Sequence, residues 1–193
     1  MKLGCVIMAA GESRRFGENK LLRTFRGVPL YVRALDAVPP GVFDRVCVVT
    51  AYEPVAEYGR ERGYLSVRND HSDWGISRTI KLGLSSLSEC DGVLFMAADQ
   101  PLLTQQTLLA LANAFRQTPD SIVSASHAGS RGNPCVFPKA LFRELMALQG
   151  DTGGSRVIKA HPDKLRLVEV PAEELADCDT AEALSKLEEK SGN

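Results

Sequence analysis

The sequence lacks long apolar runs and any excess of charge of one sign. Its apolar stretches fall well short of the ~20 consecutive residues that a membrane-spanning helix needs. Among 193 residues, 23 are basic and 24 are acidic, which leaves a formal net charge of -1. No overall field therefore attracts the chain to the phosphates of nucleic acid or to an anionic membrane. We expect neither a nucleic acid nor a membrane among its partners.

Cysteine and histidine do not form metal-binding patterns. The five cysteines are an odd number, and no two stand at a C-x-x-C spacing. The three histidines are scattered along the chain and give no zinc pattern. Cys5 and Cys47 fall in apolar segments, where a thiol behaves as a small hydrophobic group. The thiols predict a reduced protein, and we expect a cytoplasmic one.

The chain also lacks Pro/Ser-rich linkers, repeats and low-complexity segments. Its length suits one domain with a sizeable core, and we expect a single domain over residues 1–193. Apolar runs predict buried strands at residues 3–8, 44–50 and 92–98, and further strands at residues 121–126 and 164–170. Because these strands alternate with helical segments, they predict an α/β fold with a mostly parallel sheet.

Helical periodicity separates the predicted strands. Apolar residues recur at helical spacing from Ile76 to Leu87, from Leu108 to Phe115 and from Leu141 to Leu148. The charged segment 180–190 predicts a last helix. Residues 133–138 carry a proline near each end. Since proline cannot donate to a sheet ladder, we expect this segment to be a short antiparallel strand at the sheet edge.

The most informative segment is the loop that follows the first apolar run. It combines small residues with three cationic side chains. The residues are Ala9, Ala10, Gly11, Glu12, Ser13, Arg14, Arg15, Gly17 and Lys20, of which the two arginines and the lysine are the cations. A loop after the first strand lies at the carboxyl edge of the sheet, where open α/β folds bind ligands. The segment has neither Walker A spacing nor a G-x-G-x-x-G triplet. It is a different phosphate cradle or a basic surface turn, and its position favours the cradle.

Two aspartates are candidate ligands for a metal ion. Asp99 ends the most apolar strand of the chain, so it faces the same edge as the first loop. Carboxylates in such positions commonly hold Mg²⁺ that bridges phosphates, although a turn would also suit an Asp-Gln-Pro segment. Asp179 stands just before the last helix. It is either a helix cap or a second carboxylate for the ion.

The remaining candidate residues lie in three polar segments. Ser77 follows Trp74, the only tryptophan, and either caps the next helix or contacts a ligand at its N-terminus. Two glycine-rich segments, residues 129–134 and 149–156, are ordinary turns or substrate loops.

The order of these motifs resembles the nucleotidyltransferases of the molybdenum cofactor pathway. The matching segments are MAAGESRRFGENKLL, WGISRTIKLGL, MAADQPLL, GSRGNPCVFP with LQGDTGGSRVI, and the DCDT turn. They span essentially the whole chain and are specific in combination. The Ala9-Ala10-Gly11 form and the glycine-rich loops look closer to the branch that makes molybdopterin cytosine dinucleotide. Many relatives, however, carry histidine at the position of Asn133.

The resemblance implies a Rossmann-like three-layer α/β sandwich of the glycosyltransferase-A type, and it implies roles for residues at matching positions. The loop from Ala9 to Arg15 would cradle the nucleoside triphosphate, with Lys20 and Arg15 neutralising charge during catalysis. Ser77 would lie near the base and ribose. Asp99 would hold Mg²⁺, with Asp179 as the candidate second ligand, and Gly132, Asn133 and Asp151 would lie on the acceptor side.

The implied reaction transfers CMP from CTP to the phosphate of molybdopterin and releases pyrophosphate, with Mg²⁺ as cofactor. The base preference is not fixed by residue spacing, and a molybdenum hydroxylase is a further candidate partner. Two alternatives stay open. The acceptor is a sugar phosphate or another phosphorylated compound, or the protein is a non-catalytic molybdenum cofactor chaperone. Intact Lys20 and Asp99 argue against the chaperone.

Overall fold

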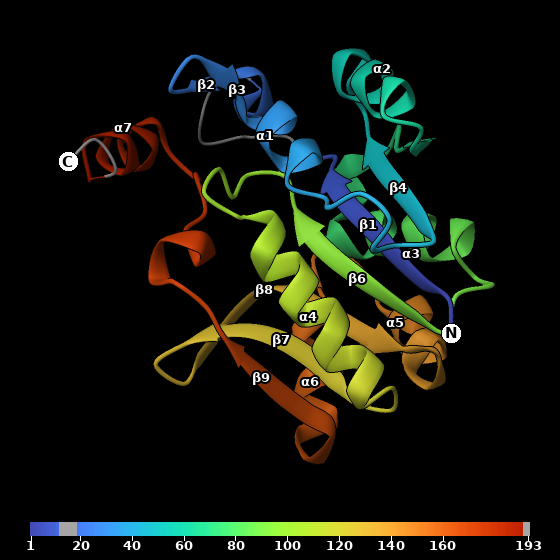
Figure 1. Ribbon diagram of the computed structural model, residues 1–193. Helices are drawn as coiled ribbons and strands as arrows, with labels where there is room; N and C mark the ends of the chain where they lie inside the picture. The colour runs from blue at the N-terminus through green and yellow to red at the C-terminus, as the bar shows by residue number, and fades with distance from the viewer. Residues whose placement is uncertain (12–18, 191–193) are drawn as a thin grey trace.

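The computed structural model describes residues 1–11 and 19–190. Within them, seven strands form one sheet in the order β5-β4-β1-β6-β8-β7-β9, and β2 pairs with β3 in a separate hairpin (Figure 1). The strands are β1 (Leu3–Ala9), β2 (Thr24–Phe25), β3 (Val28–Pro29), β4 (Arg45–Thr50), β5 (Leu65–Arg68), β6 (Gly92–Ala97), β7 (Ile122–His127), β8 (Ser130–Pro138) and β9 (Leu165–Glu169). The α-helices are α1 (Leu30–Asp36), α2 (Glu53–Glu61), α3 (Ile76–Ser86), α4 (Gln105–Gln117), α5 (Phe142–Ala147), α6 (Ser155–Ala160) and α7 (Ala181–Lys190).

The sheet is mostly parallel, as the apolar runs predict. The strand β1 pairs in parallel with β4 and β6, β4 with β5, and β7 with β9. Parallel strands need long crossover connections, and most of the α-helices lie in these connections. The carboxyl ends of β1, β4 and β6 therefore meet at one edge, which is the upper edge in Figure 1.

Helices cover both faces of the sheet and give three layers. Alternate residues of β1 enter different cores, because successive side chains of a strand point to opposite faces. Cys5 and Ile7 join the core beneath α1, α2 and α4, whereas Val6 joins the core beneath α3, α5 and α6. Figure 1 shows α4 in front of the sheet and α3 behind it. Burial on both faces accounts for the nearly continuous apolar sequence of β1 and β6.

The strand β8 is antiparallel, as predicted, but the prediction that it lies at the sheet edge is wrong. It lies inside the sheet, between β6 and β7. Its pairing with β6 ends at Cys135, and its register with β7 shifts between Ser124 and Ser126. Pro134 falls in this irregular stretch, where the ladder is interrupted, and Pro138 is the last residue of the strand. Both prolines are thus tolerated in an interior strand.

The last helix packs away from the main sheet. A small apolar cluster joins α7 to the β2–β3 hairpin through Phe25, Leu30, Cys178 and Leu184. The backbone N–H of Arg26 donates to Glu188 Oε1 at 2.7 Å and fixes the helix to the hairpin. This packing holds the segment before α7, which contains Asp177 and Asp179, beside the carboxyl edge of the sheet.

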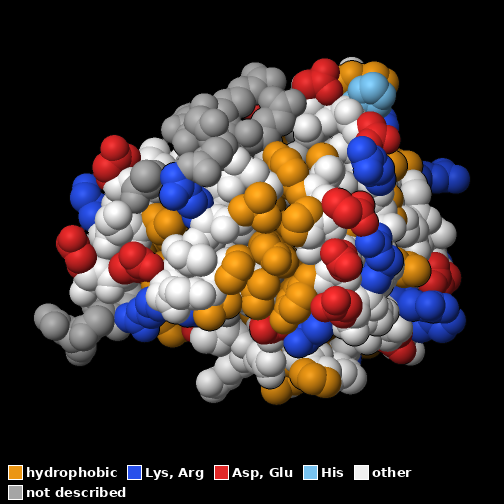
Figure 2. Space-filling view, turned by 90° about the horizontal axis from the view of Figure 1, so that it is seen from above, with side chains coloured by type: hydrophobic (Ala, Val, Ile, Leu, Met, Phe, Trp, Pro, Cys, Tyr) orange, Lys and Arg blue, Asp and Glu red, His pale blue; other side chains and the backbone are white. Residues whose placement is uncertain are grey.

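The surface mixes charges of both signs. Figure 2, which views the molecule from above, shows Lys and Arg interspersed with Asp and Glu around a central group of apolar side chains. This distribution agrees with the near-zero net charge. In the part of the chain that the structure describes, no helix has the length and apolar character needed to cross a membrane.

Candidate active site

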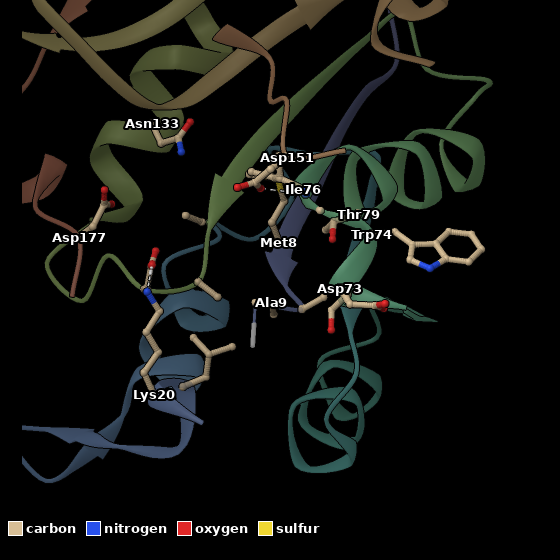
Figure 3. A pocket seen from close by; sticks show the side chains of 18 of the residues that line it. Met8, Ala9, Lys20, Asp73, Trp74, Ile76, Thr79, Asn133, Asp151 and Asp177 are labelled. Carbon is tan, nitrogen blue, oxygen red and sulfur yellow. Dashed lines mark hydrogen bonds and ion pairs between the residues drawn. The ribbon is translucent and has the colours of Figure 1, made fainter. Parts of the chain in front are cut away.

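A pocket of about 580 Å³ opens at the carboxyl edge of the sheet. Its walls come from segments far apart in the sequence, because the parallel strands end here together. Figure 3 shows Lys20 extending into it from one side, Asn133 and Asp177 from another, and Trp74 pointing away at the rim. The lining residues used below are Ala9, Ala10, Gly11, Lys20, Asp73, Trp74, Gly75, Ile76, Thr79, Asp99, Asn133, Asp151 and Asp177. We call this the first pocket.

The start of the predicted phosphate loop lies on the wall of the first pocket. Ala9 ends β1, and Ala10 and Gly11 follow it along the wall. Two side chains, one at the end of β4 and one just after it, hold this segment in place. Thr50 Oγ1 donates to the Ala9 carbonyl at 2.9 Å, and the Tyr52 hydroxyl donates to the Gly11 carbonyl at 2.8 Å.

Four predicted members of the loop lie outside the described residues. They are Glu12, Ser13, Arg14 and Arg15. Their part in binding the triphosphate therefore stays a prediction.

Lys20 begins a short 3-10 turn and reaches two carboxylates. Its Nζ donates to Asp99 Oδ2 at 2.5 Å and to Asp179 Oδ1 at 2.9 Å. The turn is fixed locally, because the Leu21 N–H donates to Asn19 Oδ1 and the Leu21 side chain is buried. The Lys20 side chain is only 13% exposed. Burial alone would lower the pKa of Lys20, but Asp99 and Asp179 outweigh it and hold the pKa above its ordinary value.

Asp99 follows β6 and presents one unused carboxylate oxygen. Its Oδ2 accepts from Lys20, whereas its Oδ1 is buried and has no hydrogen-bond partner among the described residues. A buried, unpaired carboxylate oxygen carries a desolvation cost unless a ligand satisfies it. The Cys178 N–H donates to the Asp99 carbonyl at 2.9 Å and ties the segment of Asp177 and Asp179 to this position.

Asp177 is a third carboxylate at this edge. Burial raises its pKa to about 6, and the like charges of Asp99 and Asp179 act in the same direction. Such an accumulation of carboxylates favours a cation in the pocket, and Lys20 supplies one.

The donor set fits a divalent ion that prefers oxygen ligands. The available donors are carboxylates, and Asp99 Oδ1 is orphaned. Among the described residues, no group of three His, Cys, Asp or Glu side chains could hold an ion alone. This suits Mg²⁺, which is usually bound through one or two carboxylates together with substrate phosphates and water.

The N-terminus of α3 is joined to the loop of Asp151. The Ser77 N–H donates to the Gly150 carbonyl at 3.2 Å, and the Ile76 N–H lies 3.4 Å from Asp151 Oδ1. Figure 3 shows this second contact as a dashed line. The Ser77 side chain is buried, while its neighbours Gly75 and Ile76 line the first pocket. The predicted contact of Ser77 with base and ribose stays a prediction.

A network of polar side chains holds Trp74 at the rim of the first pocket. The residue is 56% exposed, and its ring stacks on His71 at 4.6 Å between centroids and lies 4.6 Å from the Arg78 guanidinium. The fully buried Asn69 organises both partners, because its Oδ1 accepts from Arg78 Nε and from the His71 N–H. The same amide donates to Thr79 Oγ1 on the pocket wall.

A second pocket of about 410 Å³ adjoins the first. The two share Met8, Ile76, Asn133 and Asp177. The predicted acceptor residues Gly132 and Asn133 line the second pocket, while Asp151 lines only the first. The structure thus brings Lys20, Asp99, Asp179, Asn133 and Asp151 to one edge of the sheet, from five separate segments.

Residues 5–165 match the profile of the MobA-like NTP transferase domain. The chain belongs to this family. As a MobA-like NTP transferase it is a nucleotidyltransferase, and its mostly parallel sheet with flanking helices is the Rossmann-like fold that the resemblance implies.

Two named relatives are similar to this MobA-like chain over half of its length or more. The purine catabolism protein PucB of Bacillus subtilis is 29% identical over 167 residues and is covered over 80% of both chains. A probable molybdenum cofactor guanylyltransferase of Pyrococcus horikoshii is 33% identical over 103 residues, which are 53% of this chain and 51% of the relative.

Solved structures share the fold. The Rv0371c protein of Mycobacterium tuberculosis superposes with a TM-score of 0.82 at 23% identity and is covered over 98% of both chains. A further structure of that protein is a complex with manganese, with a TM-score of 0.79 at 22% identity, covering 98% of this chain and 99% of the other.

Sequence patterns miss several residues of this MobA-like site. Gln100 is buried, and its Nε2 donates to the carbonyls of Asn133 and Leu175 at 3.4 and 3.3 Å. It thereby joins two segments that contribute polar groups to the pocket edge. Thr79 is two residues beyond Ser77, the expected ligand position on α3, and it lines the first pocket about one helical turn after Ile76. The spacing of Asp177 and Asp179, with one residue between them, was the available signal for a paired carboxylate site.

Proposed function

We propose that this MobA-like NTP transferase transfers a nucleoside monophosphate from a nucleoside triphosphate to the terminal phosphate of molybdopterin and releases pyrophosphate. The observation that carries the proposal is the Lys20 and Asp99 pair beside the Ala9–Gly11 segment, in a pocket that shares lining residues with a second one. Residues 1–193 would act as a single catalytic domain. The two guanylyltransferase relatives support a molybdenum cofactor substrate.

The first pocket would bind the triphosphate donor. In the proposal, backbone groups of Ala9, Ala10 and Gly11, continuing through Glu12 and Ser13, approach the phosphates closely. Lys20, with Arg14 and Arg15, would neutralise the charge of the leaving pyrophosphate. Support comes from the place of Gly11 and Lys20 on the same pocket wall. Ser77 would lie near the base and ribose, although its side chain is buried and its neighbours Gly75 and Ile76 form the pocket lining.

Asp99 and Asp179 would hold Mg²⁺. The orphaned Asp99 Oδ1 and the all-carboxylate donor set support this assignment, and the manganese complex of a protein with the same fold is in keeping with a divalent ion. The ion, when bound, would supply Lewis-acid polarisation of the phosphoryl oxygens. Lys20 would then exchange its contacts with the two carboxylates for contacts with phosphate.

The reaction needs alignment more than a strong base. A terminal phosphate oxygen of the acceptor attacks the α-phosphorus, a new P–O bond forms, and the bond to the bridging oxygen of pyrophosphate breaks. The leaving pyrophosphate carries away the electron pair of that bond. Because the attacking oxygen is already anionic, the protein has to hold the reactants in line and stabilise charge. Lys20 is placed for the second task, beside Asp99.

The second pocket would hold the acceptor. It shares Asn133 and Asp177 with the first pocket, so a molecule placed there has access to the donor side. Gly132 and Asn133 line it, and Asp151 adjoins it through its contact with the start of α3. We propose these residues as the acceptor-binding group. A molybdenum hydroxylase is the proposed recipient of the product.

CTP is the proposed donor, because the Ala9-Ala10-Gly11 sequence resembles that of the branch that makes molybdopterin cytosine dinucleotide. The guanylyltransferase relatives make GTP the competing donor. Transfer to other phosphorylated acceptors is the second candidate reaction. The chemistry proposed for Lys20 and Asp99 is the same in each case.

Product analysis tests the proposed function. The purified protein is incubated with Mg²⁺, one triphosphate and either molybdopterin cofactor or a sugar phosphate, and the products are identified by mass spectrometry. We expect a molybdopterin dinucleotide with CTP and none with the Asp99→Asn variant. Formation of a nucleotide sugar without any molybdopterin dinucleotide would assign the acceptor differently. Cofactor binding with no transfer to any acceptor would support the chaperone instead.

A further inference from the structure

The second pocket has one cation among its described lining residues. Its floor is apolar and includes Ile80, Phe95, Phe137, Leu145 and Ile158, while its rim is polar. Arg131 lies on this rim with Ser130 and Ser155, and Asp177 is the acidic member of the described lining. A pocket with an apolar floor and few polar groups is typical of a small-molecule site, and its single guanidinium determines which charge it accepts.

The Arg131 guanidinium has little to satisfy it within the protein. Within residues 1–11 and 19–190, its hydrogen bond is from Nη1 to Ser155 Oγ at 3.3 Å, and no carboxylate lies within ion-pair distance. Other arginines differ, since Arg60 pairs with Glu53 and Arg62 with Asp36. A partly buried guanidinium with unused donors favours an anion, which it can bind with two parallel hydrogen bonds.

Local structure places Arg131 at the rim. The register between β7 and β8 shifts after Ser124, and Arg131 then pairs with Ser126. Such irregularities redirect side chains next to binding sites. Gly154 also lines the second pocket, and a Cβ added to it would lie 2.7 Å from the Phe137 ring, so glycine lets this backbone pack on the floor. That packing brings Ser155 to Arg131.

Arg131 lies apart from the proposed reacting groups. It lines the second pocket only, whereas Lys20 and Asp99 line the first pocket only. The two pockets meet at Met8, Ile76, Asn133 and Asp177. An acceptor phosphate that reaches the donor has to lie at this junction. The anion that Arg131 favours is therefore a different group from the attacking phosphate.

We propose that Arg131 binds a second anionic group of the acceptor, remote from its attacking phosphate, and so selects acceptors with two separated negative charges. This inference rests on the proposed function for the identity of the acceptor. Arg131 is here a substrate-binding residue, and Ser155 positions it. The apolar floor between Arg131 and the junction would contact the ring system that joins the two anions.

Kinetics of Arg131→Met and Arg131→Lys test the proposal. Loss of a charge-assisted, two-point contact predicts a KM for molybdopterin cofactor raised roughly 10–100-fold in Arg131→Met. Arg131→Lys keeps a point charge without the fork and should fall between this variant and the wild type. The KM for the triphosphate and kcat at saturating acceptor should stay within about twofold. The matched control is Arg166→Met, at an exposed arginine of β9.

A binding measurement separates this inference from the proposed function. Trp74 is the only tryptophan and lines the first pocket, so its fluorescence reports occupancy at the pocket edge without turnover. Titration with molybdopterin cofactor alone should show the same 10–100-fold weakening in Arg131→Met. If the wild type binds the cofactor but transfers nothing, the proposed function fails and the Arg131 contact still stands.

Two outcomes would overturn the inference. One is unchanged cofactor affinity in Arg131→Met. The other is an equal loss of triphosphate affinity, which would indicate a merely structural residue. Thermal unfolding supplies the remaining check, because removal of an unpaired charge should leave Tm unchanged or raise it. A Tm lowered together with both affinities would also count against the proposal.

Discussion

Lys20 lies where a divalent cation would also lie, between two carboxylates. Its ammonium group contacts Asp99 and Asp179 at 2.5 and 2.9 Å; the contact with Asp99 is largely buried, whereas the Asp179 side chain is 58% exposed. In the free protein, Lys20 thus neutralises charges that the metal ion and the phosphates would otherwise redistribute. Metal binding and Lys20 should therefore compete in the absence of nucleotide.

Lys20→Met should have opposite effects on metal binding and on transfer. Removing the competing charge should tighten Mn²⁺ binding to the nucleotide-free protein, by roughly tenfold. Transfer should fall roughly 10²–10³-fold, as expected for a lost electrostatic donor. Paramagnetic titration with Mn²⁺ measures the first effect, and Lys139→Met, distant in η3 (Lys139–Leu141), is the control. Weaker Mn²⁺ binding in Lys20→Met would contradict the competition.

Asp99→Asn should nearly abolish transfer and leave the fold intact. The amide has almost the same shape, but it removes the negative charge from the orphaned oxygen and from the pair with Lys20. The control Asp120→Asn changes an exposed carboxylate in the connection between α4 and β7 and should keep full activity. Circular dichroism checks the fold. An Asp99→Asn enzyme that is active and responds to metal would remove Asp99 from the site.

At the residue scale, the sequence predicted which side chains carry charge but not how they pair. Asp99 and Lys20 can be identified from local sequence. Asp99 comes at the end of a buried strand, and Lys20 belongs to the basic loop after the first strand. Their contact depends on tertiary packing across 79 residues, and the contact of Lys20 with Asp179 spans 159. The surroundings of Arg131 have the same origin, since only the folded chain determines that no carboxylate of the described residues lies within ion-pair distance of it.

At the scale of elements, the N-terminus of α3 packs against the loop of Gly150. This contact connects the proposed nucleotide-binding segment to the loop that carries Asp151, a proposed acceptor-binding residue. Gly75 has a φ of 86°, and a Cβ added there would lie 2.3 Å from the Gly150 backbone. A side chain at position 75 would therefore both strain the turn and push the Asp151 loop away. The pocket wall depends on glycine at this position.

Gly75→Ala should lower the free energy of unfolding by about 2–4 kcal/mol, because the added Cβ both clashes with backbone and is strained at a positive φ. Gly63→Ala is a matched control, because Gly63 also has a positive φ, of 76°, but an added Cβ meets no atom within 4 Å. The control should lose only about 1–2 kcal/mol. Urea unfolding measures both. Equal losses in the two variants would show that the contact with Gly150 contributes nothing.

Element prediction succeeded where the apolar pattern was continuous and failed where pairing was irregular. Strands β1, β4 and β6 were predicted because both of their faces are buried. The interior position of β8 was not, because its prolines suggest an edge. The register shift that accommodates Pro134 arises from pairing with β7, which a single strand does not encode.

At the scale of the whole molecule, all five cysteines are buried and free. Burial raises the pKa of Cys47 to about 12, and burial followed by the neighbouring Asp99 charge raises that of Cys178 to about 12. Near neutral pH these groups stay protonated, and the thiolate is the reactive form. The thiols thus act as packing groups.

Native protein should react very slowly with a thiol reagent such as DTNB, while denatured protein should expose all five thiols at once. Absorbance during the reaction with and without denaturant measures this. A native thiol that reacts as fast as free cysteine would show that at least one core is open. Such a result would contradict the closed packing of the two cores on either side of the sheet or of the small cluster that holds Cys178.

The fold class was predictable because alternation of strands and helices determines a layered α/β architecture. The two adjoining pockets were not, since each takes its walls from loops whose relative positions only the folded sheet fixes. Base choice belongs to this same scale. We expect it to depend on the width and backbone contacts of the first pocket.

Pyrophosphate release tests the proposed reaction most directly. Release is followed with CTP, GTP, ATP and UTP in turn, with Mg²⁺ present, and with or without molybdopterin cofactor. We predict release that requires the cofactor, is fastest with CTP and is lost in Asp99→Asn. Absence of cofactor-dependent release with all four triphosphates would contradict molybdopterin nucleotidyl transfer by this protein.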